Sequence, residues 1–80
     1  MNYENLYYEI EEIAENYSEV EIVDGDYDEN GGYVNIWGNP YEEQVEILMN
    51  KLKKIPEIKK IELTIAKDKE EDYDILKIEF

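Results

Sequence analysis

The chain of 80 residues contains no cysteine, no histidine and no arginine. Without cysteine it can form neither a disulfide nor a thiolate metal site, and it has no thiol nucleophile. Without histidine it lacks the commonest general base and the commonest transition-metal ligand. Without arginine it has no bidentate clamp for phosphate. Serine–histidine pairs, phosphate-binding loops and dinucleotide fingerprints are missing too, so the composition predicts a protein that is not an enzyme and uses no cofactor.

Long apolar runs are also missing. No segment approaches the roughly 20 apolar residues of a membrane-spanning helix, and the opening MNYENLYYEIEEI lacks the basic and apolar regions of a signal peptide. A chain this short forms one hydrophobic core, and its apolar content of 42% favours folding over disorder. We therefore expect a single cytoplasmic domain over residues 1–80.

Negative charge is abundant and lies in one half of the chain. The formal net charge is −14, from 22 acidic and 8 basic residues. All eight lysines lie at or after Lys51, and residues 51–80 contain as many acids as lysines, so residues 1–50 carry the whole excess. Because phosphates and anionic membranes need basic side chains, this distribution excludes direct contact with nucleic acid or a membrane. A partner should be a basic protein or nucleoprotein complex.

Two helices are expected from apolar spacing. Over residues 2–17 apolar side chains recur every three or four positions, with Asn2 as a suitable N-cap. The second helix should begin at Asn39, because Glu42 follows it at the spacing of a capping box. It should end before Pro56, since the residue preceding a proline disfavours the helical conformation.

Period-two alternation predicts four strands, over residues 19–24, 33–37, 61–65 and 76–80. Residues 25–32 have the composition of a polar loop. The order is α-β-β-α-β-β, an α+β class in which both helices cover one face of a four-stranded, mainly antiparallel sheet. It resembles a ferredoxin-like βαββαβ chain moved by one strand. That permuted topology implies the spatial strand order third, fourth, second, first.

The uncovered face of this sheet should carry three large aromatic side chains, Tyr33, Trp37 and Tyr73. Tyrosine and tryptophan offer a large contact area at a low entropic cost. The face is therefore expected to recognise a partner or a second copy of the chain, unless a loop of the protein itself covers it.

One segment resembles a calcium-binding loop. Residues 26–31 match the first six positions of the motif, with Asp24 as a further carboxylate. The calcium candidates are Asp24, Asp26, Asp28 and Asn30. The motif fails at its twelfth position, where Trp37 stands in place of a bidentate glutamate. An acidic hairpin loop is the preferred interpretation, with no functional metal site.

The clustered carboxylates remain the main candidate for function. A small domain needs a net charge of only about 2–8 for solubility, and self-repulsion beyond that lowers stability. The candidate partner-binding residues combine the acidic face of the first helix, the first hairpin and the open sheet face: Glu4, Tyr8, Glu11, Glu12, Glu15, Glu19, Glu21, Asp24, Asp26, Asp28, Glu29, Tyr33, Trp37 and Tyr73.

The size, the clustered carboxylates, the many tyrosines and the arginine-free, AT-rich-genome composition resemble those of small acidic inhibitors from phages and mobile elements, such as anti-CRISPR proteins and other DNA mimics. The resemblance covers the whole chain but includes no motif. It implies an inhibitor, in the host cytoplasm if phage-encoded, that blocks the basic nucleic-acid-binding groove of a host defence complex. Three alternatives stay open: an immunity or antitoxin protein that caps a basic nuclease toxin, a homodimeric interaction module that uses the aromatic sheet face, and a calcium-responsive domain.

Overall fold

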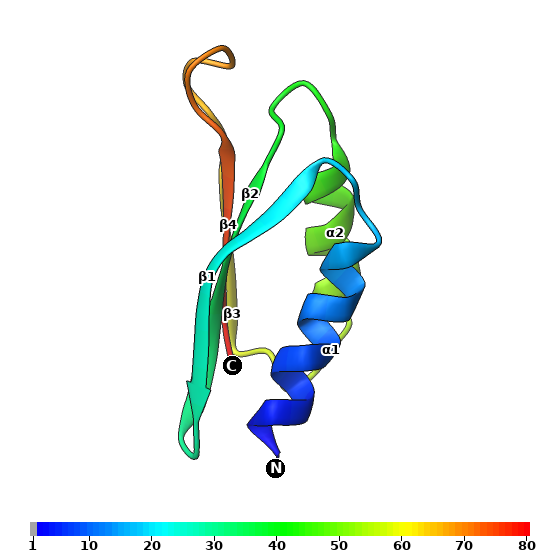
Figure 1. Cartoon of the computed structure of the whole chain (residues 1–80), viewed down its shortest axis with the longest axis vertical. Helices are drawn as coiled ribbons and strands as arrows, with labels where there is room; N and C mark the ends of the chain where they lie inside the picture. Colours follow the sequence, from blue (N-terminus) through cyan, green and yellow to red (C-terminus); the bar gives the residue numbers. More distant parts are fainter. Residues whose placement is uncertain (1) are drawn as a thin grey trace.

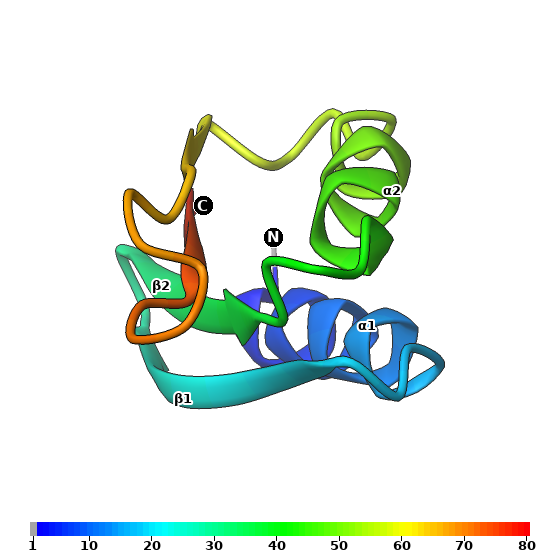
Figure 2. The same ribbon diagram turned by 90° about the horizontal axis from the view of Figure 1, so that it is seen from above.

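The computed structural model of the protein describes residues 2–80. Two helices cover one face of a four-stranded antiparallel sheet (Figures 1 and 2), which confirms the expected α+β class and element order. The elements are α1 (Tyr3–Glu15), β1 (Val20–Asp28), β2 (Gly31–Gly38), α2 (Gln44–Leu52), β3 (Lys60–Thr64) and β4 (Asp74–Glu79). The strands lie in the order β1-β2-β4-β3, as the permuted ferredoxin-like topology implies. Neither helix of the described chain is long and apolar enough to cross a membrane.

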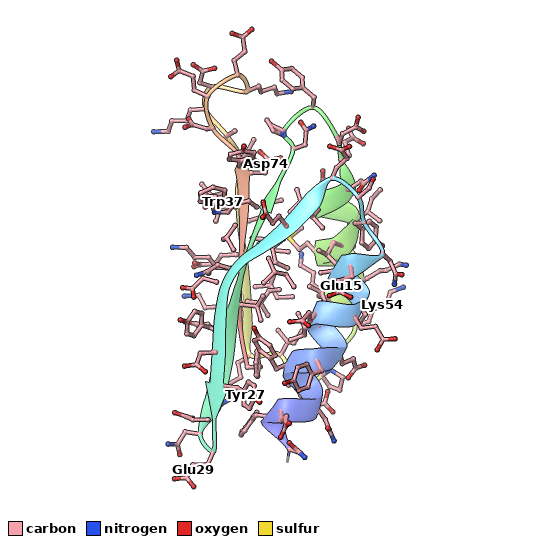
Figure 3. All side chains as sticks on the ribbon, viewed as in Figure 1. Glu15, Tyr27, Glu29, Trp37, Lys54 and Asp74 are labelled. Carbon is pink, nitrogen blue, oxygen red and sulfur yellow. The ribbon has the colours of Figure 1, made fainter. Side chains whose placement is uncertain are left out.

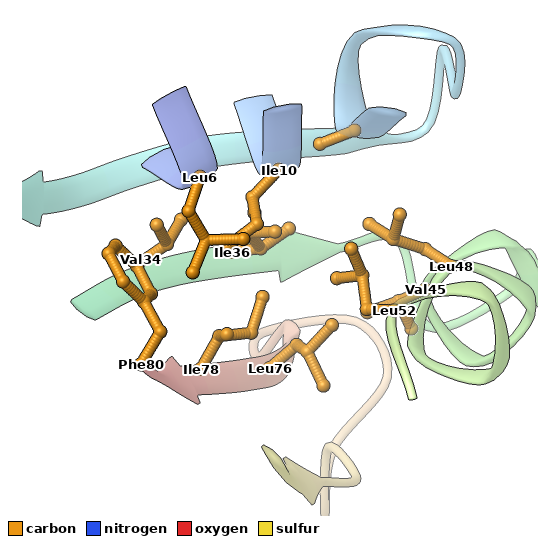
Figure 4. Packing of buried hydrophobic residues seen from close by; sticks show 11 residues of the cluster. Leu6, Ile10, Val34, Ile36, Val45, Leu48, Leu52, Leu76, Ile78 and Phe80 are labelled. Carbon is orange, nitrogen blue, oxygen red and sulfur yellow. The ribbon is translucent and has the colours of Figure 1, made fainter. Parts of the chain in front are cut away.

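The core lies between the sheet and the two helices. Inward-facing side chains of the two central strands, β2 and β4, form its floor, and one stripe from each helix covers them (Figure 4). Ile36 and Leu48, both fully buried, each contribute about 1.5–3 kcal/mol by removing their side chains from water. The buried apolar residues are Leu6, Ile10, Ala14, Val34, Ile36, Val45, Leu48, Leu52, Leu76, Ile78 and Phe80.

Helix α1 begins where the sequence predicted. The side-chain oxygen of Asn2 accepts hydrogen bonds from the backbone N–H groups of Glu4, at 3.0 Å, and Asn5, at 3.4 Å. These bonds satisfy two of the donors that the first turn of a helix leaves free. The helix ends at Glu15, slightly before the expected end at residue 17.

Helix α2 begins later than predicted. The Asn39 side chain does not cap a helix; its oxygen accepts the N–H of Tyr41 at 2.9 Å, which forms a local turn. Its side-chain amide donates to the Glu19 carboxylate at 3.0 Å, so this link to the first half of the chain holds the turn. The helix itself starts at Gln44, and it ends at Leu52 rather than just before the proline.

Strand β1 is longer than predicted, and the expected loop over residues 25–32 is wrong. The strand continues to Asp28, and only Glu29 and Asn30 form the turn into β2. A bulge between Ile22 and Asp24 shifts the register and changes which side chains face the helices.

Two further corrections concern the second hairpin. Strand β3 ends at Thr64, and Ile65, expected in the strand, lies outside it and is 57% exposed. Strand β4 spans Asp74–Glu79 rather than residues 76–80. The connection from Ile65 to Tyr73 is held by Asp74, which is only 6% exposed. One carboxylate oxygen of Asp74 accepts the backbone N–H of Ala66 at 2.8 Å, and this bond fixes the base of the loop.

Candidate protein-binding surfaces

Carboxylates flank β1, which is an edge strand of the sheet. On α1, residues three and four positions apart share one side of the helix, and this spacing aligns Glu4, Glu11 and Glu15. A hollow beside the start of β1 is lined by Glu11 and Glu15, and another beside its far end is lined by Glu4 and Tyr27. The acidic side of α1 therefore runs alongside β1.

The outer face of β1 carries a second acidic row. After the bulge, alternate side chains of the strand point away from the helices, and the three that do so are exposed aspartates. Together the two rows border the free edge of β1 from the helix layer and from the sheet face. We call this surface the acidic edge; it comprises Glu4, Tyr8, Glu11, Glu15, Asp24, Asp26 and Asp28.

Three tyrosines lie between the two acidic rows. The ring centroid of Tyr7 is 5.1 Å from that of Tyr27 and 5.7 Å from that of Tyr8, and Tyr8 and Tyr27 are 6.3 Å apart. Figure 3 shows Tyr27 on the helix side of the sheet, near the start of α1. The strand makes room for Tyr7 at Gly25, where a Cβ atom would lie 2.9 Å from the phenolic oxygen. The glycine that suggested a loop is thus a packing site within the strand.

Burial, hydrogen bonding and nearby carboxylates raise the pKa values of Tyr7, Tyr27 and Tyr33. Burial and then the charge of Glu11 raise the pKa of Tyr7. A hydrogen bond with Tyr8, followed by burial and the charge of Glu4, raises the pKa of Tyr27 to about 12. On the other face of the sheet, the charge of Asp24 raises the pKa of Tyr33, whose hydroxyl donates to that carboxylate at 3.4 Å. The phenols therefore stay neutral within an acidic surface.

The acidic edge is not neutralised by lysines of the protein itself. Over residues 2–80 the one ion pair joins Lys60 and Glu62, at 3.2 Å, on β3 at the opposite side of the sheet. Other lysines approach aromatic rings instead of carboxylates: Lys51 lies 5.5 Å from the ring centroid of Tyr17, and Lys69 lies 5.7 Å from that of Tyr41. The negative charge of the first half of the chain therefore faces solvent.

Aspartates also occupy hydrogen-bond donors on the free edge of β1. Gly32 exchanges both of its backbone hydrogen bonds with Phe80, which follows β4, so its backbone groups point away from β1. Tyr27 is the residue of β1 opposite Gly32, and its N–H therefore points away from β2. That N–H donates to the Asp26 carboxylate at 2.8 Å, and the N–H of Gly25, two residues earlier, donates to Asp24 at 2.9 Å. The aspartates thus engage the donors that another strand would need.

The calcium candidates do not lie in the loop that the motif requires: three are on β1, and Asn30 is in the turn after it. Asp24, Asp26 and Asp28 lie at alternate positions of an extended strand, where carboxylates stand about 6.6 Å apart along the chain. The side chain of Asp28 accepts a hydrogen bond from the N–H of Asn30, in the turn that follows, at 2.7 Å. Within residues 2–80, no three acidic groups are placed so that they could hold a metal ion.

The outer face of the sheet has an aromatic end. The rings of Trp37 and Tyr73 stack with centroids 5.1 Å apart and an interplanar angle of 18°, and they are 40% and 52% exposed. A pocket of about 390 Å³ beside them is lined also by Ile65 and Ile75. In Figure 3, Trp37 points away from the helices, at a distance from the hairpin tip marked by Glu29. The loop before β4 contributes Tyr73 to this stack, and both rings stay partly exposed.

The predicted partner-binding residues therefore separate into groups. Glu21 pairs with Trp37 across β1 and β2, so it belongs to the aromatic end. Glu12 is exposed on α1 outside the stripe beside β1. Glu19 is half-buried and structural, because its backbone N–H donates to the Gln44 side chain at 2.9 Å.

No known protein family matches this chain. Neither a curated protein nor a solved structure shows significant similarity to it.

Sequence reasoning missed Tyr27, which lies beside α1, and Asp74, which holds the loop beside the aromatic end. Tyr27 was placed in a loop, and only the bulge before Asp24 shows that it faces α1. Asp74 follows a polar segment and resembles its neighbours in the sequence, but it is the one buried acidic side chain of the described residues. A carboxylate directly before an apolar strand was the available signal.

Proposed function

We propose that the protein is an inhibitor that binds the basic nucleic-acid-binding groove of a host complex through its acidic edge. One observation carries the proposal: two rows of carboxylates flank an edge strand, and none of them forms an ion pair within the described chain. Self-repulsion of so much charge lowers the stability of a small fold, whereas a positively charged groove relieves it.

Regular spacing supports binding in place of a phosphate backbone. Successive turns of α1 repeat about every 5.4 Å, and alternate residues of β1 repeat about every 6.6 Å. Two rigid elements thus hold negative charges at fixed intervals along one edge. A groove lined by lysine and arginine to accept phosphates would meet carboxylates instead, and the encounter would be fast and sensitive to salt.

The tyrosine rings add a contribution that carboxylates alone do not make. Lysine and arginine bind the faces of aromatic rings as well as carboxylates. Tyr7, Tyr8 and Tyr27 place such rings between the acidic rows. A basic partner would therefore find both kinds of acceptor in one surface.

An anti-defence role, as in anti-CRISPR proteins, is the form of this proposal that we favour. An immunity protein that caps a basic nuclease toxin would use the same electrostatics. The two differ in genomic setting, because a toxin gene beside this gene favours immunity and a phage neighbourhood favours anti-defence. In either case the partner is cationic.

A second candidate function rests on the aromatic end of the sheet. Exposed stacked rings beside an apolar pocket are typical of an interaction hot spot. A homodimer or an interaction module that used Trp37 and Tyr73 would bind with little dependence on salt. Loss of binding in Trp37→Ala and Tyr73→Ala, with no effect of charge reversal at the acidic edge, would favour this function.

The test compares two double charge reversals with equal net charge. Glu4→Lys with Glu15→Lys changes exposed residues of the acidic edge, and Glu70→Lys with Glu71→Lys changes exposed residues of the loop before β4. Immobilised protein is incubated with host lysate at low salt, and proteins eluted by rising salt are identified by mass spectrometry. The identified partner is then purified, and its nucleic-acid binding is measured with each variant as competitor.

We expect the wild type and the loop variant to displace nucleic acid and the acidic-edge variant to lose that effect. Binding that persists in molar salt would contradict the proposal. Equal loss in both variants would show that net charge, and not the acidic edge, governs binding.

A further inference from the structure

The two edges of the sheet differ in their capacity to accept another strand. Figure 2 shows β1 and β3 at opposite sides of the sheet, and within the described chain no element other than β4 pairs with β3. The donors at the β1 edge are engaged by aspartates, as described above. The β3 edge has no such protection.

Backbone groups of β3 point to its free edge. Phe80 exchanges backbone hydrogen bonds with Gly32. Along β4, the backbone N–H and C=O groups of alternate residues therefore point toward β2, and those of the intervening residues point toward β3. By the same alternation, Ile61 and Leu63 direct their N–H and C=O groups away from β4. Unpaired edge groups of this kind are a template for strand addition.

We propose that β3 pairs antiparallel with β3 of a second copy, centred on Ile61, to form a dimer with a continuous eight-stranded sheet. The proposal is independent of the function proposed above. With a two-fold axis at Ile61, each residue that precedes Ile61 lies opposite the residue that follows Ile61 by the same number of positions in the other copy. This places Lys60 opposite Glu62 of the other copy, and Glu62 opposite its Lys60.

Charge favours a second copy in this register. Lys60 and Glu62 lie on the outer face of β3, with side chains about half exposed and paired with one another at 3.2 Å. In the dimer these four charges alternate in sign around the two-fold axis. The backbone N–H and C=O groups of Lys60 and Glu62 point toward β4 and not toward the second copy. Across the dimer axis these residues therefore form the non-hydrogen-bonded type of cross-strand pair, in which side chains lie closer together.

The overall charge distribution also permits this approach. Residues 51–80, which include β3, carry no net charge, whereas the excess lies in residues 1–50. Because the acidic edge borders β1 at the opposite side of the sheet, pairing through β3 holds the two acidic edges apart. Pairing through β1 would bring them together.

Apolar side chains continue across the same axis. A small groove beside β3 is lined by Ile55, Ile58 and Ile61 together with Lys53, Lys59 and Lys60. The three isoleucines are half-buried and pack against the core. Two-fold pairing at Ile61 joins this groove to its copy on the helix side of the sheet. The contact is self-complementary and closes as a dimer, so it leads to no open chain of subunits.

The test is a charge-swap cycle measured by sedimentation equilibrium from micromolar to millimolar concentration. Lys60→Glu and Glu62→Lys each replace two attractions by two repulsions, and the double variant restores both pairs. Lys69→Glu and Glu70→Lys, in the loop before β4, are controls with the same net charges. Circular dichroism confirms that each variant is folded.

We expect the wild type to dimerise, each single β3 variant to raise the dissociation constant about tenfold, and the double variant to recover wild-type affinity. A monomer at every concentration would overturn the proposal, and so would a dimer whose affinity responds equally to β3 variants and controls.

Discussion

The ring of Tyr27 lies 5.1 Å from that of Tyr7, between carboxylates contributed by a helix and by a strand. Burial raises the pKa of Tyr7, a hydrogen bond with Tyr8 raises that of Tyr27, and the carboxylates add to both shifts. The arrangement defines a pH range in which the fold should respond to ionisation of these phenols.

The first prediction concerns alkaline titration of Tyr27. Its pKa is raised from 10.0 to about 12 in the folded protein, so the unfolded chain loses this proton first as pH rises. Stability should therefore fall between pH 10 and pH 12. Tyr27→Phe should show a smaller fall and should lose the last component of the tyrosinate absorbance change. Tyr41→Phe, which removes one exposed phenol outside the acidic edge, should keep that component.

The second prediction concerns salt. Raising sodium chloride from low concentration to about 0.5 M shortens the range of electrostatic repulsion, so the melting temperature of the wild type should rise. Glu4→Gln with Glu15→Gln should be more stable than the wild type at low salt and should gain less from added salt. A melting temperature that falls on addition of salt would mean that internal attractions, and not repulsion, dominate.

The third prediction concerns the β1 edge. Asp26→Ala frees the N–H of Tyr27 for pairing with another chain, so light scattering on prolonged incubation should increase. Asp26→Asn keeps an accepting oxygen and should remain soluble, although it loses the same charge. Glu21→Ala removes one charge from the same strand without freeing an edge donor. If Glu21→Ala aggregates as fast as Asp26→Ala, charge alone protects this edge.

The fourth prediction concerns the buried carboxylate of Asp74. Asp74→Ala leaves the N–H of Ala66 without its partner, which costs about 1–3 kcal/mol. Hydrogen exchange at Ala66 should accelerate, and the loop before Tyr73 should lose its fixed base. Asp74→Asn retains an acceptor and should lose less protection, and Asp72→Ala, an exposed change nearby, should leave the exchange rate unaltered.

Element order, both helix faces and the strand order could be predicted because they follow from periodicity and connection rules. The continuation of β1 could not. Asp-Gly-Asp is typical of a turn, and the local sequence carries no sign that Gly25 accommodates Tyr7. The predicted start of α2 was wrong for a related reason. Asn39 suits a turn as well as a helix cap, and its contact with Glu19 decides between the two.

The candidate site was predicted in composition but not in geometry. The acidic residues of the first helix and the first hairpin were identified, yet their division across the free edge of one strand depends on the bulge between Ile22 and Asp24. A bulge is a tertiary compromise between strand pairing and packing. Its position cannot be obtained from alternation of residue types alone.

Trp37 is the single tryptophan of the chain, and it lies on the solvent side of the sheet rather than in the core. Its fluorescence is therefore a built-in optical probe of one face. Docking onto the aromatic end should change the emission directly, while a partner held only at the acidic edge should leave it nearly constant. Titration of unlabelled protein can thus tell the two surfaces apart before any variant is made.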